Sequence, residues 1–258
     1  MLIDTHCHLT DERLAGETEN IIASLEADGL ESVITVGYDE PSSREGAQLA
    51  ARFADVYCTV GMHPHDASAA TQDVYDEFVS LANGNPKVVA IGEIGLDYYY
   101  DLSPRETQKK VFAEQLELAR FLELPVCLHV RDAYEDCRRI LADNADKLTY
   151  GVLLHCYSGS AEMVPVFGKF DAYFAFGGAI TFKNARRNLE ALLAVPRDRL
   201  LLETDCPYMT PVPYRGQTNF PKYVNLVADK AAEVLGLQRA EVEDITTENA
   251  KRLFNRLK

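Results

Sequence analysis

Six histidines are the residues of this sequence that point most clearly to chemistry, because each lies at the end of a short apolar run or directly after one. They are His6, His8, His63, His65, His129 and His155. In the run DTHCH (residues 4–8), side chains of an extended strand alternate, so His6 and His8 point to the same side. Two imidazoles on one face can chelate one metal ion. A lone histidine is more often structural, but this pair with four comparable histidines favours metal ligation.

Acidic residues follow two further apolar runs. Glu93 comes directly after the run that ends at Gly92, and Glu203 and Asp205 share one face after the run that begins at Leu200. A buried carboxylate is rarely left unpaired, and the sequence offers Glu93 no obvious Arg or Lys, so we expect it to bridge two metals. The predicted ligands are His6, His8, Glu93, His129, His155 and Asp205. Four imidazoles and two carboxylates exceed one tetrahedral site and suit two divalent ions, Zn²⁺ or Mn²⁺ and less comfortably Mg²⁺.

Two histidines remain outside this ligand set. His63 and His65 lie in the run GMHPH (residues 61–65), and the six ligands above already fill two sites. We expect His63 to donate to the substrate or to orient a ligand. For His65, a structural role on the loop is at least as well supported.

The elements that position these residues alternate regularly along the chain. Eight apolar runs predict strands at Leu2–His6, Ser32–Val36, Val56–Gly61, Val88–Gly92, Val126–Val130, Gly151–His155, Ala172–Gly177 and Leu200–Thr204. Helical patterns include Glu17–Asp28, Ser42–Phe53, Pro104–Leu122, Ala133–Asp143 and Ala185–Ala194, and two more follow the last run, around Lys222–Leu235 and Thr247–Leu257. Such alternation implies parallel strands with helical crossovers.

Eight strand–helix units without a long insertion favour a closed (β/α)8 TIM barrel, an α/β fold of one domain with an extra C-terminal helix. An open doubly wound sheet remains the alternative, because the number of strands does not prove closure. In a barrel the C-terminal ends of all strands meet on one face, where active sites lie. That face would gather the histidines.

Composition limits what this chain binds and where it works. With 47% hydrophobic and 26% charged residues it is typical of a globular enzyme. Its 26 basic against 40 acidic residues give a net charge of −14, which argues against extended DNA binding but allows a site for one or two phosphates. Six cysteines without a CxxC pair indicate reduced core thiols. Asp4, His6 and His8 interrupt the first apolar run, so we expect no signal peptide or membrane span and a cytoplasmic protein. No feature of the sequence indicates an obligate protein partner.

Several motifs, taken in chain order, resemble the TatD family of metal-dependent deoxyribonucleases, a branch of the amidohydrolase-like barrel enzymes. They are DTHCHL (4–9), GMHPH (61–65), GEIGLDYY (92–99), LHVRDA (128–133), LHCYSG (154–159), LLETDCPY (201–208), PYRGQTNFP (213–221) and TENA (247–250). The resemblance covers residues 1–258 as one domain, and the six ligands match the family's two-metal set. It implies cleavage of DNA phosphodiesters from the 3′ end, with some members acting at abasic or damaged sites.

A mechanism follows as a hypothesis. The metal pair would generate a hydroxide, and Asp205 would take or relay its proton. Glu203 would orient a ligand from outside the ligand shell. Three residues are expected to hold the remaining phosphate oxygens: Arg215, His63 and Lys183. Tyr98 would stack on a base or hydrogen-bond the substrate, although a packing role for this ring is equally supported. For Arg215, a solvated charge on a loop is an equally supported alternative to phosphate binding.

Two other functions compete with a nuclease. A small-molecule amidohydrolase or lactonase would use the same barrel and metals, since fold and metals do not set the substrate. The charge of −14 favours this rival modestly, whereas Glu93 stands where many such enzymes bridge their metals with a modified lysine. A barrel kept only as a binding scaffold is disfavoured, because a buried polar cluster is costly without metal.

Overall fold

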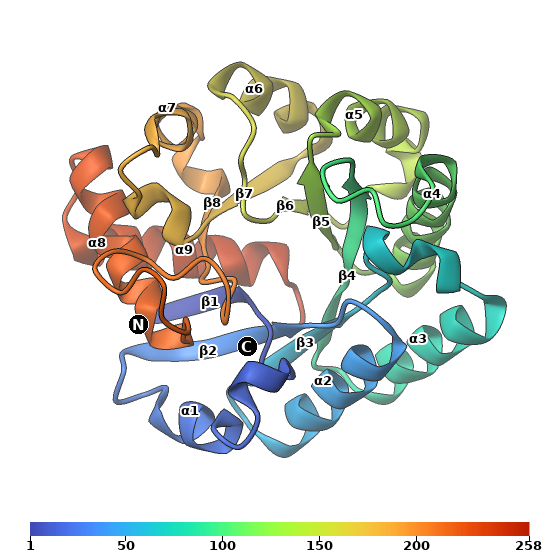
Figure 1. The fold of residues 1–258 in the computed structure, drawn as a ribbon, viewed down its shortest axis with the longest axis horizontal. Coiled ribbons are helices and arrows are strands. Elements are labelled where there is room, and N and C mark those ends of the chain that lie inside the picture. Colours follow the sequence, from blue (N-terminus) through green and yellow to red (C-terminus); the bar gives the residue numbers. More distant parts are fainter. Residues whose placement is uncertain (258) are drawn as a thin grey trace.

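The computed structural model describes residues 1–257, and its eight strands form one parallel sheet in chain order (Figure 1). The strands are β1 (Leu2–Cys7), β2 (Leu30–Val36), β3 (Val56–Val60), β4 (Val88–Asp97), β5 (Val126–Arg131), β6 (Val152–Leu154), β7 (Ala172–Phe176) and β8 (Leu200–Leu202). A parallel bridge between Cys7 and Cys206 joins the two ends of the sheet, and the His8 N–H donates to the Cys206 carbonyl at 2.7 Å. The sheet is therefore a closed barrel. The predicted fold is confirmed, and the open-sheet alternative is wrong.

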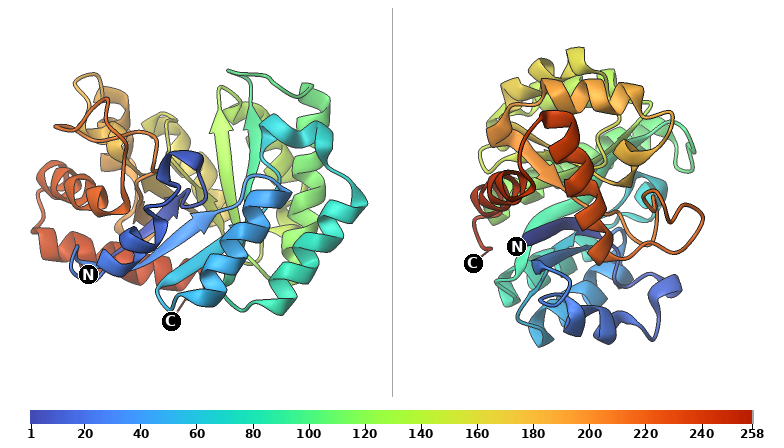
Figure 2. Two further views of the ribbon diagram at one scale, coloured as in Figure 1. Left: turned by 60° about the horizontal axis from the view of Figure 1, so that its bottom comes forward. Right: turned by 90° about the vertical axis from the view of Figure 1, so that its left-hand side faces the viewer.

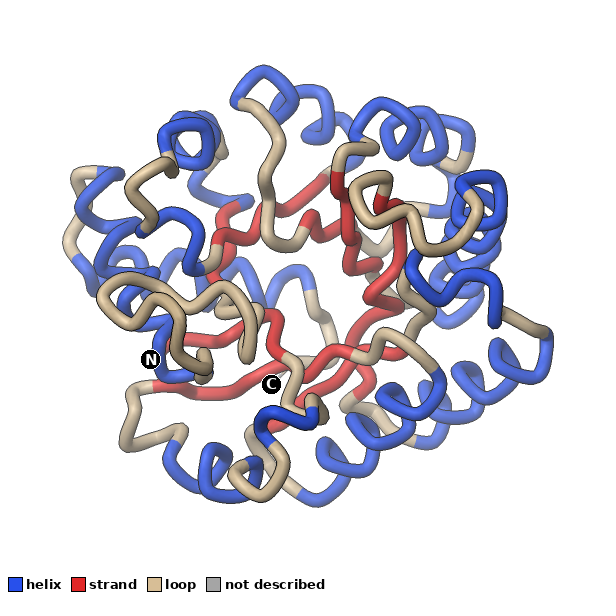
Figure 3. Tube along the Cα trace, in the orientation of Figure 1, coloured by secondary structure: helices blue, strands red, loops and turns tan. Residues whose placement is uncertain are grey.

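Helices follow the strands and form a ring around the barrel (Figure 3). They are α1 (Thr18–Ser24), α2 (Glu40–Arg52), α3 (Gln72–Gly84), α4 (Arg105–Leu122), α5 (Tyr134–Asp143), α6 (Val164–Phe167), α7 (Arg186–Ala194), α8 (Val224–Leu235) and α9 (Arg239–Leu253). Their apolar residues recur at helical spacing, as Phe112, Leu116 and Ala119 do on the buried face of α4. Within residues 1–257, no helix is both long and apolar enough to cross a membrane.

The last helix begins earlier than the sequence pattern predicts. We expected Thr247–Leu257, whereas α9 spans Arg239–Leu253. At its start the Glu241 carboxylate accepts a hydrogen bond from the Gln238 N–H at 2.8 Å, which satisfies a backbone donor that the helix cannot. Gln238 is not among the residues that usually mark a helix start, and this explains the missed turns.

This helix seals the N-terminal end of the barrel, and it lies behind the strands in Figure 1. Ala250, Leu253, Phe254 and Leu257 form one apolar cluster with buried residues from all eight strands, including Ile3, Ile34, Tyr57, Leu153 and Leu201. In the left view of Figure 2, the strand arrows point away from α9. The barrel is thus closed by apolar side chains at one end, which leaves the other end for polar groups.

Candidate metal centre

A cavity of about 700 Å³ opens where the strands end, opposite α9. Its lining includes five of the six histidines together with Glu93 and Asp205. The sixth, His6, lies beneath them and is fully buried. The barrel therefore brings all six predicted ligands together on the face where we expected them.

The end of β1 supplies the first pair of imidazoles. The Nε2 atoms of His6 and His8 lie 3.3 Å apart, so both rings point to one side of the strand as alternation predicts. Two nitrogens bound at about 2.0–2.1 Å to one tetrahedral zinc ion are separated by roughly 3.3–3.4 Å. The pair is therefore spaced as two ligands of one cation.

Strand β4 places Glu93 by an irregularity that we did not predict. We expected the strand to end at Gly92, but β4 continues to Asp97, so Glu93 lies inside it. Between Ile91 and Ile94 the pairing with β5 shifts register, as in a β-bulge, and a bulge re-aims a side chain. A Cβ atom on Gly92 would lie 2.5 Å from the Cys127 Cβ, so only glycine allows β4 and β5 to approach this closely.

The two carboxylate oxygens of Glu93 face different groups of imidazoles. Oε2 lies 3.6 Å from the His6 Nε2 and 3.8 Å from the His8 Nε2. Oε1 lies 2.8 Å from both the His129 Nδ1 and the His155 Nε2. Asp205 joins the first group, with its Oδ1 3.4 Å from the His8 Nε2. Glu93 thus stands between two sets of nitrogen ligands.

Hydrogen bonds on the far side of each ring decide which nitrogen is free to bind a cation. The His129 Nε2 lies 3.0 Å from the Asp97 Oδ2, and the His8 Nδ1 lies 3.3 Å from the Val36 carbonyl oxygen. Both partners only accept, so each can take the ring proton when a cation binds the opposite nitrogen of the neutral ring. The His129 Nδ1 and the His8 Nε2 would then give their lone pairs to the cation beside Glu93, as metal-binding histidines do.

His155 also has a carboxylate on its far side, Glu203, but its Nδ1 makes no hydrogen bond to it. The His155 Nδ1 lies 3.5 Å from the Glu203 Oε1, while the Nε2 faces the centre. Glu203 is fully buried, and its Oε1 also accepts the Cys156 N–H at 2.6 Å. Glu203 is thus placed beside a predicted ligand, and its role in orienting that ligand stays a prediction.

His63 differs from these rings in its proton position. Its Nδ1 accepts the His65 N–H at 3.1 Å and therefore carries no proton. The Nε2 of the neutral ring must then be the N–H, and it lies 3.5 Å from the Glu93 Oε1. Burial lowers the pKa of His63 to about 4, which favours this neutral form. His63 thus offers a donor to the centre where the other rings offer lone pairs.

The carboxylates give the cluster a negative field. Burial alone lowers the pKa of His8, but Asp205 and Glu93 outweigh it and raise that pKa above its usual value. In the same way Glu93 and Glu203 raise the pKa of His155 well above its usual value against the effect of burial. Burial raises the pKa of Glu93, yet the imidazoles around it, His155 foremost, hold it well below its usual range. A field that favours extra protons here also favours divalent cations, and the nitrogen and oxygen donors fit Zn²⁺ or Mn²⁺.

Comparison with known proteins decides the family. The family described as TatD related DNase matches residues 3–255 of this chain. The chain belongs to the TatD family. An uncharacterized metal-dependent hydrolase, YabD of Bacillus subtilis, is 42% identical over 254 residues, which are 98% of this chain and 99% of the relative. The 3′-5′ ssDNA/RNA exonuclease TatD of Salmonella typhimurium is 31% identical over 259 residues, with 98% of each chain covered.

The crystal structure of the TatD homologue YJJV from Escherichia coli K12 superposes with a TM-score of 0.92, at 29% identity and with 98% of both chains covered. These matches make the chain a metal-dependent hydrolase of the TatD type, as its motifs predict.

Three predicted substrate contacts lie apart from the cavity of this TatD protein. Of the residues described here, those that line it do not include Tyr98, Arg215 or Lys183. The Tyr98 hydroxyl donates to Asp136 at 2.7 Å, and the Arg215 guanidinium lies 3.8 Å from the ring centre of Phe182. Lys183 is exposed to solvent. Tyr98 and Arg215 thus make contacts within the protein, away from the cavity lining. Of the four predicted substrate contacts, only His63 lines the cavity, and only His63 enters the proposed function.

The sequence reasoning missed four residues that the structure places at the cavity. Asp97, Tyr100, Arg131 and Tyr208 all line it. Asp97 accepts hydrogen bonds from His65 and His129, each with 3.0 Å between the ring Nε2 and the Asp97 Oδ2. His65 therefore helps to hold the site rather than only its loop. Arg131 and Tyr208 lie two and three residues after the predicted ligands His129 and Asp205, and that proximity was the available clue for them; Asp97 and Tyr100 lie four and seven residues after Glu93.

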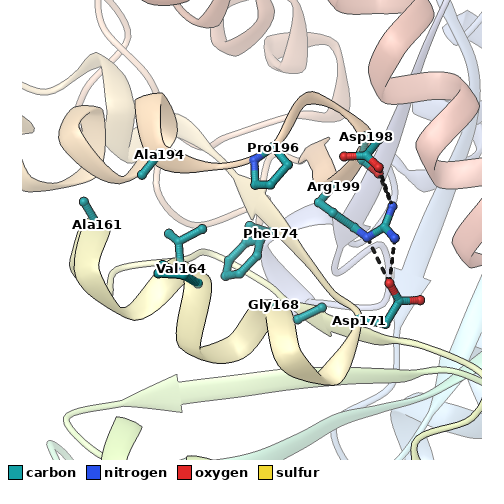
Figure 4. Close-up of a pocket in the computed structure, with 11 residues that line it drawn as sticks. Ala161, Val164, Gly168, Asp171, Phe174, Ala194, Pro196, Asp198 and Arg199 are labelled. Carbon is teal, nitrogen blue, oxygen red and sulfur yellow. Dashed lines mark hydrogen bonds and ion pairs between the residues drawn. The ribbon is translucent and has the colours of Figure 1, made fainter.

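A second cavity, of about 510 Å³, lies outside the barrel between α6 and α7 (Figure 4). Its charged lining residues are Asp171, Asp198 and Arg199. Arg199 pairs with Asp171 at 2.6 Å and with Asp198 at 3.0 Å, as the dashed lines in Figure 4 show. Because Arg199 already pairs with both carboxylates and no histidine is among the described residues that line it, this cavity offers no counterpart to the metal centre.

Proposed function

We propose that this TatD-family hydrolase cleaves phosphodiester bonds of single-stranded DNA from the 3′ end, damaged ends included, at two divalent ions. The observation that carries the proposal is Glu93, whose two oxygens face two separate sets of imidazoles at 2.8–3.8 Å. The name of the Salmonella relative, an exonuclease on single-stranded DNA and RNA, supports the choice of substrate.

Two groups of residues would hold the ions. His6, His8 and Asp205 would form one site and His129 and His155 the other, with Glu93 shared between them. Bound divalent ions would stabilise charge on a phosphate and lower the pKa of a nearby water. The known donor sets for Zn²⁺ and Mn²⁺ include both imidazole and carboxylate.

Asp205 is the residue we propose to receive the proton from the attacking water. Burial raises its pKa, but His8, His155 and His6 outweigh burial and lower it below its usual value, so the side chain is an ionised acceptor. It lines the cavity and is 14% exposed, which lets it reach a water there. Because the carboxylate also lies 3.4 Å from the His8 Nε2, its position is fixed.

Two donors would hold the phosphate oxygens. The His63 N–H points into the centre beside Glu93. Arg131 is the only Arg or Lys among the described residues that line the cavity, and its planar guanidinium suits forked contact with phosphate. One arginine also agrees with the net charge of −14, because the site would grip one or two phosphates rather than a long strand.

The test compares substrates directly. Purified protein is assayed for nucleotide release from a 3′-labelled single-stranded DNA and for hydrolysis of a panel of cyclic amides and lactones, with and without a chelator. We expect chelator-sensitive release from DNA. Hydrolysis of amides or lactones without action on DNA would show a small-molecule amidohydrolase instead, and a metal-free protein inactive on all substrates would show a scaffold.

A further inference from the structure

Two groups of tyrosine and arginine side chains stand on opposite sides of the cavity mouth, and of these residues only Arg131 has a role in the function proposed above. Tyr99 and Tyr100 follow β4 and contact Arg131 at the end of β5. Tyr208 follows β8 and contacts Arg13, which follows β1. In an eight-stranded barrel, β4 and β5 lie across from β8 and β1. The metal centre thus lies between two exposed aromatic groups.

The group beside β4 is held in place from below. The Asp97 Oδ1 accepts the N–H of Tyr99 at 2.9 Å and of Tyr100 at 2.8 Å, which fixes the backbone that carries both rings. The rings remain 59% and 55% exposed. Arg131 lies with its guanidinium carbon 3.9 Å from the ring centre of Tyr99 and 4.8 Å from that of Tyr100. Apart from these two ring contacts, its guanidinium has no hydrogen-bond or ion-pair partner within residues 1–257, so its N–H donors are free.

The group beside β8 is equally fixed, but its charge is neutralised. The Tyr208 hydroxyl donates to the Asp11 Oδ2 at 2.9 Å, and the Arg13 guanidinium binds both oxygens of Asp11 at 2.9 and 2.8 Å. Arg13 covers one face of the Tyr208 ring at 3.9 Å. The ring nevertheless is 46% exposed and lines the cavity.

We propose that these two groups are stacking sites for two nucleobases, one on each side of the scissile phosphate, so that the ligand is an unpaired strand lying across the mouth. This inference rests on the proposed function. Aromatic rings bind the π-face of any base, and Arg adds to that attraction. A chain with net charge −14 and one arginine in its cavity gains little from phosphate attraction, so stacking must supply much of the affinity.

The charges assign different roles to the two sides. Because Arg131 is free, the side beside β4 would take a base together with a phosphate oxygen. Because the Arg13 guanidinium is already paired with Asp11, it has no charge left for a phosphate, and the side beside β8 would take a base alone. Bases in a duplex are already stacked and paired on both sides, so this mouth selects single strands.

The test measures binding apart from cleavage. Fluorescence anisotropy of the metal-loaded protein is measured with a hydrolysis-resistant phosphorothioate oligothymidylate and with the same strand lacking bases. We expect the wild-type protein to prefer the strand with bases at least ten-fold. Tyr100→Ala and Tyr208→Ala should each lose about ten-fold affinity for that strand and none for the strand without bases, whereas Tyr100→Phe and Tyr208→Phe keep wild-type affinity.

The control is Phe121→Ala, which removes an equally exposed ring (69%) near the end of α4 and should change nothing. Equal affinity of the wild-type protein for both strands, or unchanged affinity in both Ala variants, would overturn the stacking sites. Failure of the proposed function would be seen separately, as absence of cleavage of an ordinary oligonucleotide by the same metal-loaded protein.

Discussion

Replacing Asp97 by Asn tests how the candidate centre is built, because this fully buried side chain holds two histidines at once. The Asp97 Oδ2 lies 3.0 Å from the Nε2 of His65 and of His129, and the Oδ1 accepts the N–H of Tyr99 and Tyr100. An asparagine must keep its oxygen toward the two backbone N–H groups. Its amide nitrogen would then face both imidazoles.

The consequence for His129 follows from its proton. With a donor opposite, the His129 Nε2 must accept, and the ring proton moves to the Nδ1, the atom that lies 2.8 Å from Glu93 and would bind the cation. Loss of such an orienting partner costs about 10–100-fold in metal affinity or activity. That range corresponds to roughly 1.4–2.7 kcal/mol.

The assay is competition for the metal with a chromophoric chelator, with turnover measured at saturating metal. Asp136→Asn is the matched control. Asp136 also accepts a side-chain hydrogen bond, from the Tyr98 hydroxyl, but it does not line the cavity. We expect Asp97→Asn to weaken the binding of one ion at least ten-fold and Asp136→Asn to leave it unchanged. Wild-type metal affinity and turnover in Asp97→Asn would refute the proton argument.

Three further predictions address catalysis, stability and substrate attraction. Asp205→Asn should keep the circular dichroism and thermal unfolding of the wild type but lower turnover by orders of magnitude, and near-normal turnover would exclude its role as proton acceptor. Phe254 is 1% exposed in the apolar cluster that closes the N-terminal end of the barrel. Phe254→Ala should therefore lower the free energy of unfolding, measured in urea, by about 3–5 kcal/mol. A loss below about 1 kcal/mol would contradict a structural role of this cluster in closing the barrel. Affinity for single-stranded DNA should fall only gently with salt, by about 0.7 log units per decade for each phosphate gripped, and a slope of several units would contradict a mouth with one arginine.

Much of the candidate site could be predicted because ligation depends on residue type and strand position. His6 and His8 share a face by the alternation of any strand, and the closed barrel then brings them to Glu93, 85 or more residues away in the chain. The apolar runs placed every strand, since a parallel sheet buried on both faces needs them. Both patterns are local in the sequence, and the closed barrel then brings the residues they identify to one site.

The details that depend on contacts between distant segments could not be predicted. The β-bulge at Glu93 arises where β4 meets β5, and nothing in GEIGLDYY alone indicates it. The free guanidinium of Arg131 is known only when the residues around it are placed. Tyr98 was favoured over Tyr100 for the substrate because the three tyrosines at 98–100 look alike in sequence, whereas Asp136 engages Tyr98 and leaves Tyr100 at the cavity.

The metal content of the wild-type protein and of Glu93→Gln, measured by mass spectrometry after desalting, tests the central claim most directly. If Glu93 joins two sites, the wild-type protein retains about two divalent ions per chain. Glu93→Gln, which keeps the shape of the side chain but removes its charge, retains at most one. One ion in the wild-type protein, or two ions retained by Glu93→Gln, would contradict a centre built around this carboxylate.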